Sequence, residues 1–130
     1  MVIDIVTLAS ICKLAIEGGN KLLEEFKKRK LSEAEKELLV AAAKDGEFHI
    51  MQVNEAPDWI RAGGKYFPND ITGDLAIAEK YHDAFESLCK RGYIRHDDGI
   101  LFRLTHAGFE KARQLARKTD KKKANKHQPN

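Results

Sequence analysis

Residues 81–116 read YHDAFESLCKRGYIRHDDGILFRLTHAGFEKARQLA, and this stretch decides the fold. Apolar residues at helical spacing predict a helix over residues 74–91, which the glycine of the RGYI string ends. Asp98-Gly99 is a strong signal for a tight hairpin, and apolar residues flank it on both sides. Thr105 then caps a last helix that we expect to reach residue 118. The stretch therefore predicts a helix, a hairpin and a second helix in succession.

The same stretch resembles the recognition helix, wing and closing helix of winged helix-turn-helix proteins, particularly the MarR-like and PadR-like regulators. The matching features are Leu88 three residues before the string RGYI, a short hairpin, and Leu104-Thr105 with Gly108 three residues further on. Each has a physical role, since the glycine of RGYI supplies a left-handed helix cap and Thr105 caps the closing helix. The resemblance implies an α+β winged-helix domain, an architecture that serves DNA binding, protein docking and dimerisation alike.

The chain before this stretch supplies another helix and further strands. Ser32 and Glu35 form a capping box, which predicts a helix from Ser32 to a left-handed cap at Gly46. The run of residues 48–53 is short and is bounded by turn-forming residues, which is typical of a strand. Gly63-Gly64 connects two short apolar runs, residues 59–62 and 65–67, and predicts a β-hairpin. A typical winged helix has a helix at this place, so the hairpin replaces part of the helix-turn-helix.

Residues 3–29 have the apolar spacing of a long helix, with a bend or break favoured at Gly18-Gly19-Asn20. Apolar residues alternate at spacings of three and four, which is the seam of a helix packed along another helix, and Ala9, Ile16 and Leu23 widen this seam. Such breadth suits burial against a domain, or against a domain plus a partner chain. We expect a homodimer through the residues of the seam: Ile5, Leu8, Cys12, Ala15, Leu22 and Phe26.

Composition and charge describe one globular domain with a basic end. The chain has 130 residues, 42% of them apolar, which is enough for a single core. Of its 23 basic residues four lie in residues 121–130, which leaves 19 against 20 acidic residues in the rest. A near-neutral body lacks the basic field that supplies most non-specific nucleic-acid affinity. The expected divisions are a helical segment (1–30), a winged-helix domain (31–118) and a basic disordered tail (119–130), which is either a solvated end or a phosphate-binding arm.

The sequence has the pattern of neither a signal peptide nor a membrane span, because Asp4, Lys13 and Glu17 interrupt its most apolar segment. The expected location is the cytoplasm, where Cys12 and Cys89 are reduced, buried thiols. Two helical turns separate His82 from Cys89, too far for one zinc ion without other ligands. No nucleophile has an adjacent base. We therefore expect no enzyme activity, no metal and no cofactor.

The candidate contact residues lie mainly on the helix over residues 74–91, for which Asp70 or Thr72 is the expected cap. With Ile77, Tyr81, Phe85 and Leu88 inward, its outward face also includes Ser87 and Arg91. Its carboxylates would face phosphate repulsion in a DNA groove. The candidates for contact with a partner or with DNA are Glu79, Lys80, His82, Asp83, Glu86 and Lys90 on this helix, Arg95 and Arg103 in the wing, and Arg61 and Lys65 in the first hairpin.

Two further alternatives concern the first hairpin and the function as a whole. Trp59, Tyr66 and Phe67 either stack on bases or anchor a protein partner, or they close the core, with core positions favoured for Trp59 and Phe67. The leading functional hypothesis is a protein-interaction or dimerisation module whose partner is a second copy or another protein, with no membrane partner. The alternative is a DNA-binding transcriptional regulator whose wing and basic tail contact phosphates, with weak nucleic-acid binding expected. A third is an accessory part of a larger assembly.

Overall fold

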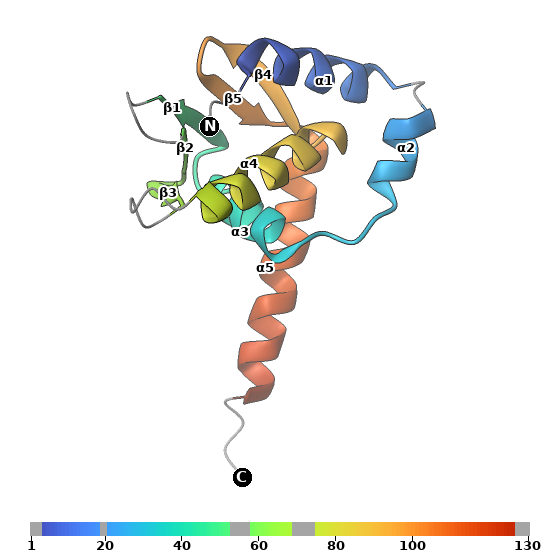
Figure 1. Ribbon diagram of the computed structural model, residues 1–130. Helices are drawn as coiled ribbons and strands as arrows, with labels where there is room; N and C mark the ends of the chain where they lie inside the picture. The colour runs from blue at the N-terminus through green and yellow to red at the C-terminus, as the bar shows by residue number, and fades with distance from the viewer. Residues whose placement is uncertain (1–3, 19–20, 53–57, 69–74, 127–130) are drawn as a thin grey trace.

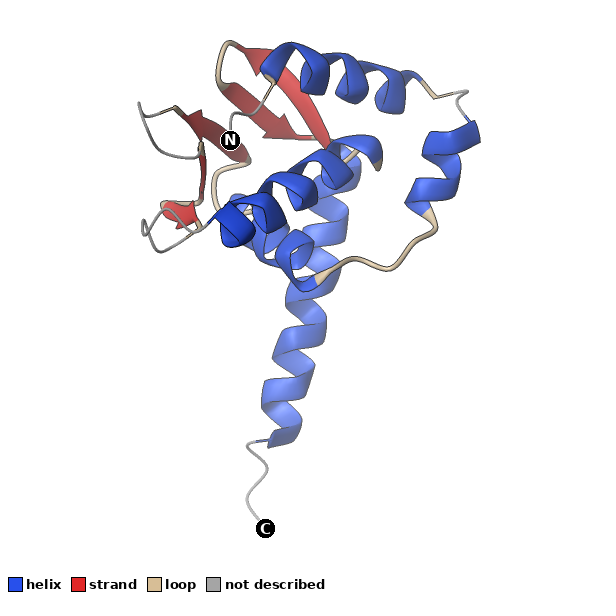
Figure 2. Ribbon diagram, viewed as in Figure 1, coloured by secondary structure: helices blue, strands red, loops and turns tan. Residues whose placement is uncertain are grey.

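The computed structural model describes residues 4–18, 21–52, 58–68 and 75–126 of the chain. Within these ranges it is an α+β structure with five helices and five strands (Figures 1 and 2). The α+β class predicted from the sequence is therefore confirmed. In chain order the elements are α1 (Ile5–Glu17), α2 (Lys21–Lys27), α3 (Glu33–Ala42), β1 (Glu47–Met51), β2 (Trp59–Ala62), β3 (Lys65–Phe67), α4 (Leu75–Lys90), β4 (Ile94–Asp98), β5 (Leu101–Leu104) and α5 (His106–Lys126).

The strands form one antiparallel sheet in the order β3-β2-β1-β5-β4. The predicted hairpin at Gly63-Gly64 is present as β2 and β3, and both glycines have positive φ angles, 57° and 82°. Glycine is also required at position 63 for steric reasons, because a Cβ atom there would collide with the backbone carbonyl of Ala41. The hairpin at Asp98-Gly99 is likewise present, as β4 and β5. Because β1 pairs with β5 as well as β2, it joins the two hairpins into one sheet.

Three phenylalanines at the centre of the core tie α4 to this sheet. The ring of Phe85 from α4 meets Phe48 of β1 at a centroid distance of 5.3 Å and Phe102 of β5 at 5.2 Å, both edge to face. All three side chains are fully buried. Edge-to-face pairs add to the stabilisation from burial alone, so Phe85 anchors α4 on the middle of the sheet.

The buried face of α4 differs from the predicted one at its first turn. Ile77, expected inside, is 40% exposed, and Ala78 is buried in its place. The reason is helical phase: at 100° per residue Ala78 lies within about 20° of Phe85, whereas Ile77 is about 80° away. Residues 70, 72 and 74, proposed for the cap and the start of this helix, lie outside the described residues.

Both predicted N-terminal caps of the neighbouring helices are confirmed. Ser32 and Glu35 form the capping box of α3, with Ser32 N–H donating to Glu35 Oε1 at 3.1 Å and Glu35 N–H donating to Ser32 Oγ at 3.2 Å. The predicted left-handed cap at Gly46 is wrong in its position, because α3 ends at Ala42 with Ala43 as its C-cap in the right-handed helical region, and a turn then leads to Gly46, whose φ is 78°. The Thr105 hydroxyl accepts from the Gly108 N–H at 3.1 Å and so caps α5.

The two ends of the chain depart from the predicted segments. The predicted helix over residues 3–29 is interrupted, since α1 ends before Gly18, whose φ is 77°, and α2 begins at Lys21. At the other end α5 continues to Lys126, beyond the expected end at residue 118, and projects away from the rest of the fold (Figure 1). Residues 119–126 contain neither glycine nor proline, and lysine and alanine are good helix formers. Within the described residues, no helix has the length and apolar character needed to cross a membrane.

Candidate interaction surfaces

The outward face of α4 carries part of the predicted set of contact residues. Glu79, Lys80 and Asp83 are exposed. Glu86 and Lys90 are partly buried and form an ion pair with each other at 3.8 Å. His82 is also partly buried, and its Nε2 lies 2.6 Å from the carbonyl oxygen of Asp58, so the ring is held against the segment before β2. The accessible charge on this face is therefore that of Glu79 and Asp83 against Lys80.

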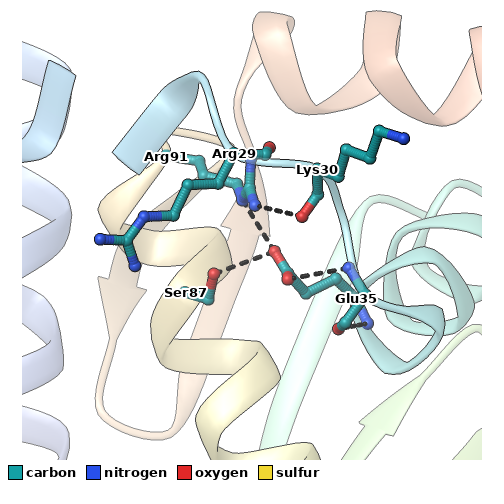
Figure 3. Close-up of polar contacts among 6 residues, drawn as sticks. Arg29, Lys30, Glu35, Ser87 and Arg91 are labelled. Atoms are coloured by element: carbon teal, nitrogen blue, oxygen red, sulfur yellow. Dashed lines mark hydrogen bonds and ion pairs between the residues drawn. The ribbon is translucent and has the colours of Figure 1, made fainter. Parts of the chain in front are cut away.

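Arg91, predicted to point outward, is instead buried, and Figure 3 shows its polar contacts. Its Nε donates to Glu35 Oε2 at 2.7 Å, and its Nη1 and Nη2 donate to the carbonyls of Arg29 at 2.6 Å and Lys30 at 3.1 Å. The Ser87 hydroxyl donates to the same carboxylate oxygen at 2.9 Å. This cluster, which we call the α3–α4 clasp, joins the segment before α3 to the end of α4. Arg91 and Ser87 are therefore unavailable for DNA or a partner.

Glu35 has two roles in the clasp, and the sequence reveals only the first. Its Oε1 completes the capping box of α3, while its Oε2 receives Arg91 and Ser87. In the described part of the chain, every buried side-chain nitrogen and oxygen has a hydrogen-bond partner. A buried ion pair satisfied in this way is tolerated in the core, where an unpaired charge would not be. The residue types and the geometry of the clasp are those of a contact that stabilises the fold by joining α3 to α4.

The end of the clasp also holds Phe26, which the sequence assigns to a dimer contact. The guanidinium of Arg29 lies 4.6 Å from the centroid of the Phe26 ring, Lys90 Nζ lies 5.1 Å from it, and the guanidinium of Arg91 lies 5.8 Å from it. Cations at these distances are attracted to the ring face. Phe26 is partly buried by its own chain, so its ring is not free as a dimer contact.

In the β4–β5 hairpin, the arginines proposed as phosphate contacts face carboxylates. Arg103 Nε donates to Asp97 Oδ2 at 2.7 Å, and its Nη1 lies 3.1 Å from Glu47 Oε1. The hydrogen bond from Arg103 lowers the pKa of Asp97, and Asp97 in turn raises the pKa of Arg103. Arg95 is more exposed and lies 3.9 Å from Asp97 Oδ1. The Arg103 charge is thus compensated within the fold, which weakens its case as a phosphate contact.

The β2–β3 hairpin divides its aromatic residues between core and surface. Phe67 is buried, as expected for a core position, and the centroid of its ring lies 5.4 Å from that of Tyr81. Trp59 is partly buried, and Tyr66 is 39% exposed. The centroids of their two rings lie 6.2 Å apart. Arg61 and Lys65 are exposed, and remain candidate contact residues.

Helix α1 lies beside β4 and α4 (Figure 1). Leu8, Cys12 and Ala15 are buried in this contact and Ile5 is partly buried. The assignment of these residues to a contact between two chains is therefore wrong for the packing seen here, because the domain itself covers them. The side chain of Leu22 lies outside the part of the chain whose side chains are described.

The other sides of α1 expose large apolar side chains that the sequence argument did not single out as contacts. Val6 is 77% exposed, and Leu14 and Ile16 are each 50% exposed. The signal was available in the composition of the helix, IVTLASICKLAIE, whose only charged residues are Lys13 and Glu17. At 100° per residue, Leu14 and Ile16 lie about 80° to either side of Val6, so the three side chains are spread over the half of α1 turned away from the domain, which we call the outer face of α1.

The described residues contain no group of three or more His, Cys, Asp or Glu side chains arranged to hold a metal ion. Their two cysteines, Cys12 and Cys89, are free and buried. Comparison of the chain with protein-family models, with curated proteins and with solved structures gives no match.

Proposed function

We propose that this chain is a protein-interaction module with a winged-helix architecture, and that it pairs with a second copy through the outer face of α1. The element order from α3 to α5 supports the architecture, with β2 and β3 inserted between β1 and α4. The strand order β1-β5-β4 agrees with a wing hairpin that returns to pair with the first strand. Because this architecture serves several functions, the interaction role needs support from a surface.

The observation that carries the proposal is the exposure of Val6, Leu14 and Ile16 on a helix whose inner side is already buried. Large aliphatic side chains exposed together on one element commonly mark a surface that another protein covers. The domain covers one side of α1, and a second protein surface would cover the remainder. Aliphatic side chains of this size offer nothing to phosphate, so the expected partner surface is apolar.

A second copy is favoured because the exposed charge on α1 is self-complementary. Lys13 and Glu17 are both exposed and lie one helical turn apart. In an antiparallel pair related by a two-fold axis, Lys13 of one copy can face Glu17 of the other, and the reverse contact follows by symmetry. Closed two-fold dimers are also the commonest symmetric assembly.

The oligomeric state of matched variants tests the proposal. We expect the wild-type chain to sediment as a dimer, and Leu14→Glu and Val6→Glu to give monomers with unchanged circular dichroism, because each places a charge in an apolar contact. Val40→Glu is the matched control, since Val40 is 46% exposed on α3, away from α1, and this variant should remain dimeric. A wild-type monomer at high micromolar concentration would contradict the proposal.

DNA binding remains the second candidate, and the basic sequence at the end of α5 favours it. Residues 121–126 include four lysines and continue a helix that projects from the fold. Two observations oppose DNA binding. Glu79 and Asp83 place negative charge on α4, and carboxylates compensate the charge of Arg103. We expect duplex binding at the non-specific level, about 10⁻⁵ M at physiological salt, with a steep decrease as salt rises.

The carboxylates of α4 supply the discriminating variant. Combined Glu79→Gln, Asp83→Gln and Glu86→Gln should strengthen duplex binding if α4 approaches phosphates, and should leave it unchanged if this face does not meet DNA. Sequence-specific binding at nanomolar strength by the unmodified chain would replace the interaction module with a transcriptional regulator.

A further inference from the structure

The only two cysteines of the chain are brought together where α1 packs on α4. Cys12 lies on α1 and Cys89 near the end of α4, and their relative exposures are 1% and 0%. Both side chains belong to the same buried core cluster, and Cys12 is the neighbouring thiol that contributes to the raised pKa of Cys89. Residues distant in sequence thus place two sulfur atoms side by side, at the contact that attaches the N-terminal helix to the domain.

One of the two thiols borders a path to solvent. A cavity of about 460 Å³ between α1 and β4 is lined by Cys12, together with Ala9, Lys13, Ile16, Arg95 and His96 among others. Lys13 and Arg95 are exposed, so the cavity opens at the surface beside them. Cys89 does not line this cavity. A small polar oxidant that enters the cavity therefore reaches Cys12 first, with Cys89 behind it.

We propose that Cys12 and Cys89 form a redox-active dithiol, which hydrogen peroxide converts into a disulfide joining α1 to α4. The Cys12 sulfur, as thiolate, attacks one peroxide oxygen; the O–O bond breaks, hydroxide leaves and becomes water on taking up a proton, and Cys12 becomes a sulfenic acid. The Cys89 sulfur then attacks the Cys12 sulfur; the S–O bond breaks, a second water leaves with the Cys89 proton, and the S–S bond forms. Two thiols and one peroxide give one disulfide and two waters.

The surroundings of Cys89 agree with its place as the second thiol. Burial raises the pKa of Cys89 well above its ordinary value, and the neighbouring Cys12 thiol and the Glu86 charge raise it further. A thiol that stays protonated is a poor first nucleophile towards peroxide. Once Cys12 carries the sulfenic acid, proximity makes attack by Cys89 an intramolecular step.

Intact-mass spectrometry of the folded full chain after peroxide treatment tests the inference. We expect a loss of two hydrogen atoms, a cross-linked peptide containing Cys12 and Cys89, and full reversal by dithiothreitol. The disulfide would also constrain the unfolded chain, so the melting temperature should rise by roughly 5 °C or more in the oxidised form.

Two single variants separate the steps. In Cys89→Ala, peroxide should leave a sulfenic acid on Cys12 that dimedone traps, whereas in Cys12→Ala the mass of the folded chain should not change. If either variant fails to fold, the wild-type mass and peptide map still decide the matter. Thiols that stay unreacted in the folded chain, oxygen adducts without a cross-link, or a disulfide between two chains would each overturn the proposal, and would leave the α1 dimer proposal untouched.

Discussion

Two arginines of this chain, Arg91 and Arg103, each donate to a carboxylate through Nε at 2.7 Å, yet their surroundings are opposite. In the α3–α4 clasp the side chains of Arg91 and Glu35 are 3% and 7% exposed. In the β4–β5 hairpin the side chains of Arg103 and Asp97 are each 35% exposed. The same pair geometry is therefore part of the core in one place and part of the surface in the other.

The difference determines what each pair can do. A buried charge that loses its partner cannot be solvated, so the clasp makes its members mutually dependent. A surface pair that loses a member is rescued by water and salt ions, so the hairpin pair contributes little to stability. It does, however, reduce the positive potential that the hairpin would offer to phosphate.

The largest effect is expected from breaking the clasp. Glu35→Ala leaves Arg91 buried and uncompensated and removes one half of the capping box, so the free energy of unfolding should fall by about 3–5 kcal/mol. Urea denaturation followed by circular dichroism measures this change. Glu33→Ala is the matched control, because Glu33 lies in the same first turn with its side chain 81% exposed. A loss of similar size in Glu33→Ala would show that the buried contacts of Glu35 in the clasp add no stability of their own.

A smaller effect is expected from the third member of the clasp. Ser87→Ala removes one hydrogen bond to the Glu35 carboxylate and leaves the ion pair in place, so the loss should be about 1–2 kcal/mol. Ser10→Ala on the exposed side of α1 serves as the control, and its stability should remain within about 0.5 kcal/mol of wild type. Equal stabilities of Ser87→Ala and wild type would restrict the clasp to the ion pair alone.

The contrast also shows what the sequence can and cannot predict. The hairpins at Gly63-Gly64 and Asp98-Gly99 and the capping box at Ser32 depend on residues close together in the chain, and all three are present. Local pattern therefore predicts the elements well. It could not place Arg91 inside, because its carboxylate partner Glu35 comes from a different helix.

The same limitation applies to the candidate surfaces. The heptad seam of α1 correctly identifies the side that becomes buried, but periodicity does not specify whether the covering surface belongs to the same chain or to another. Here β4 and α4 cover it. Val6 and Leu14 fall outside the seam, and their importance follows only once the inner side is known to be occupied.

In the exposed pair of the β4–β5 hairpin, Arg103→Gln should change the denaturation midpoint far less than Glu35→Ala does in the clasp. Water replaces the contacts that the arginine made with Asp97 and Glu47. Any difference from wild type should shrink further in high salt, because exposed charges are screened. Urea denaturation at low and high salt measures both effects. A large loss that is insensitive to salt would mean that the hairpin pair behaves as the buried one does.

The smallest effect concerns the titration of Asp97, which reports the hairpin pair directly. Its pKa in the folded chain is lowered, chiefly by the hydrogen bond from Arg103. The contribution of the pair to stability is therefore complete above the ordinary carboxyl pKa of about 4, and is lost as pH falls through the lowered value. In Arg103→Gln the pKa of Asp97 should rise towards the ordinary value, as followed by NMR of the carboxyl carbon.

Asp4 provides the internal control for this titration. Its pKa is also lowered, but the first cause is the hydrogen bond from the Thr7 side chain. Arg103→Gln should therefore leave the pKa of Asp4 unchanged while that of Asp97 rises. Equal shifts of both carboxyls would indicate a change in the field of the whole protein, and an unchanged Asp97 would show that Arg103 does not hold this carboxylate in solution. Either outcome would remove the evidence that the hairpin arginine is compensated, and would strengthen the case for Arg103 as a phosphate contact.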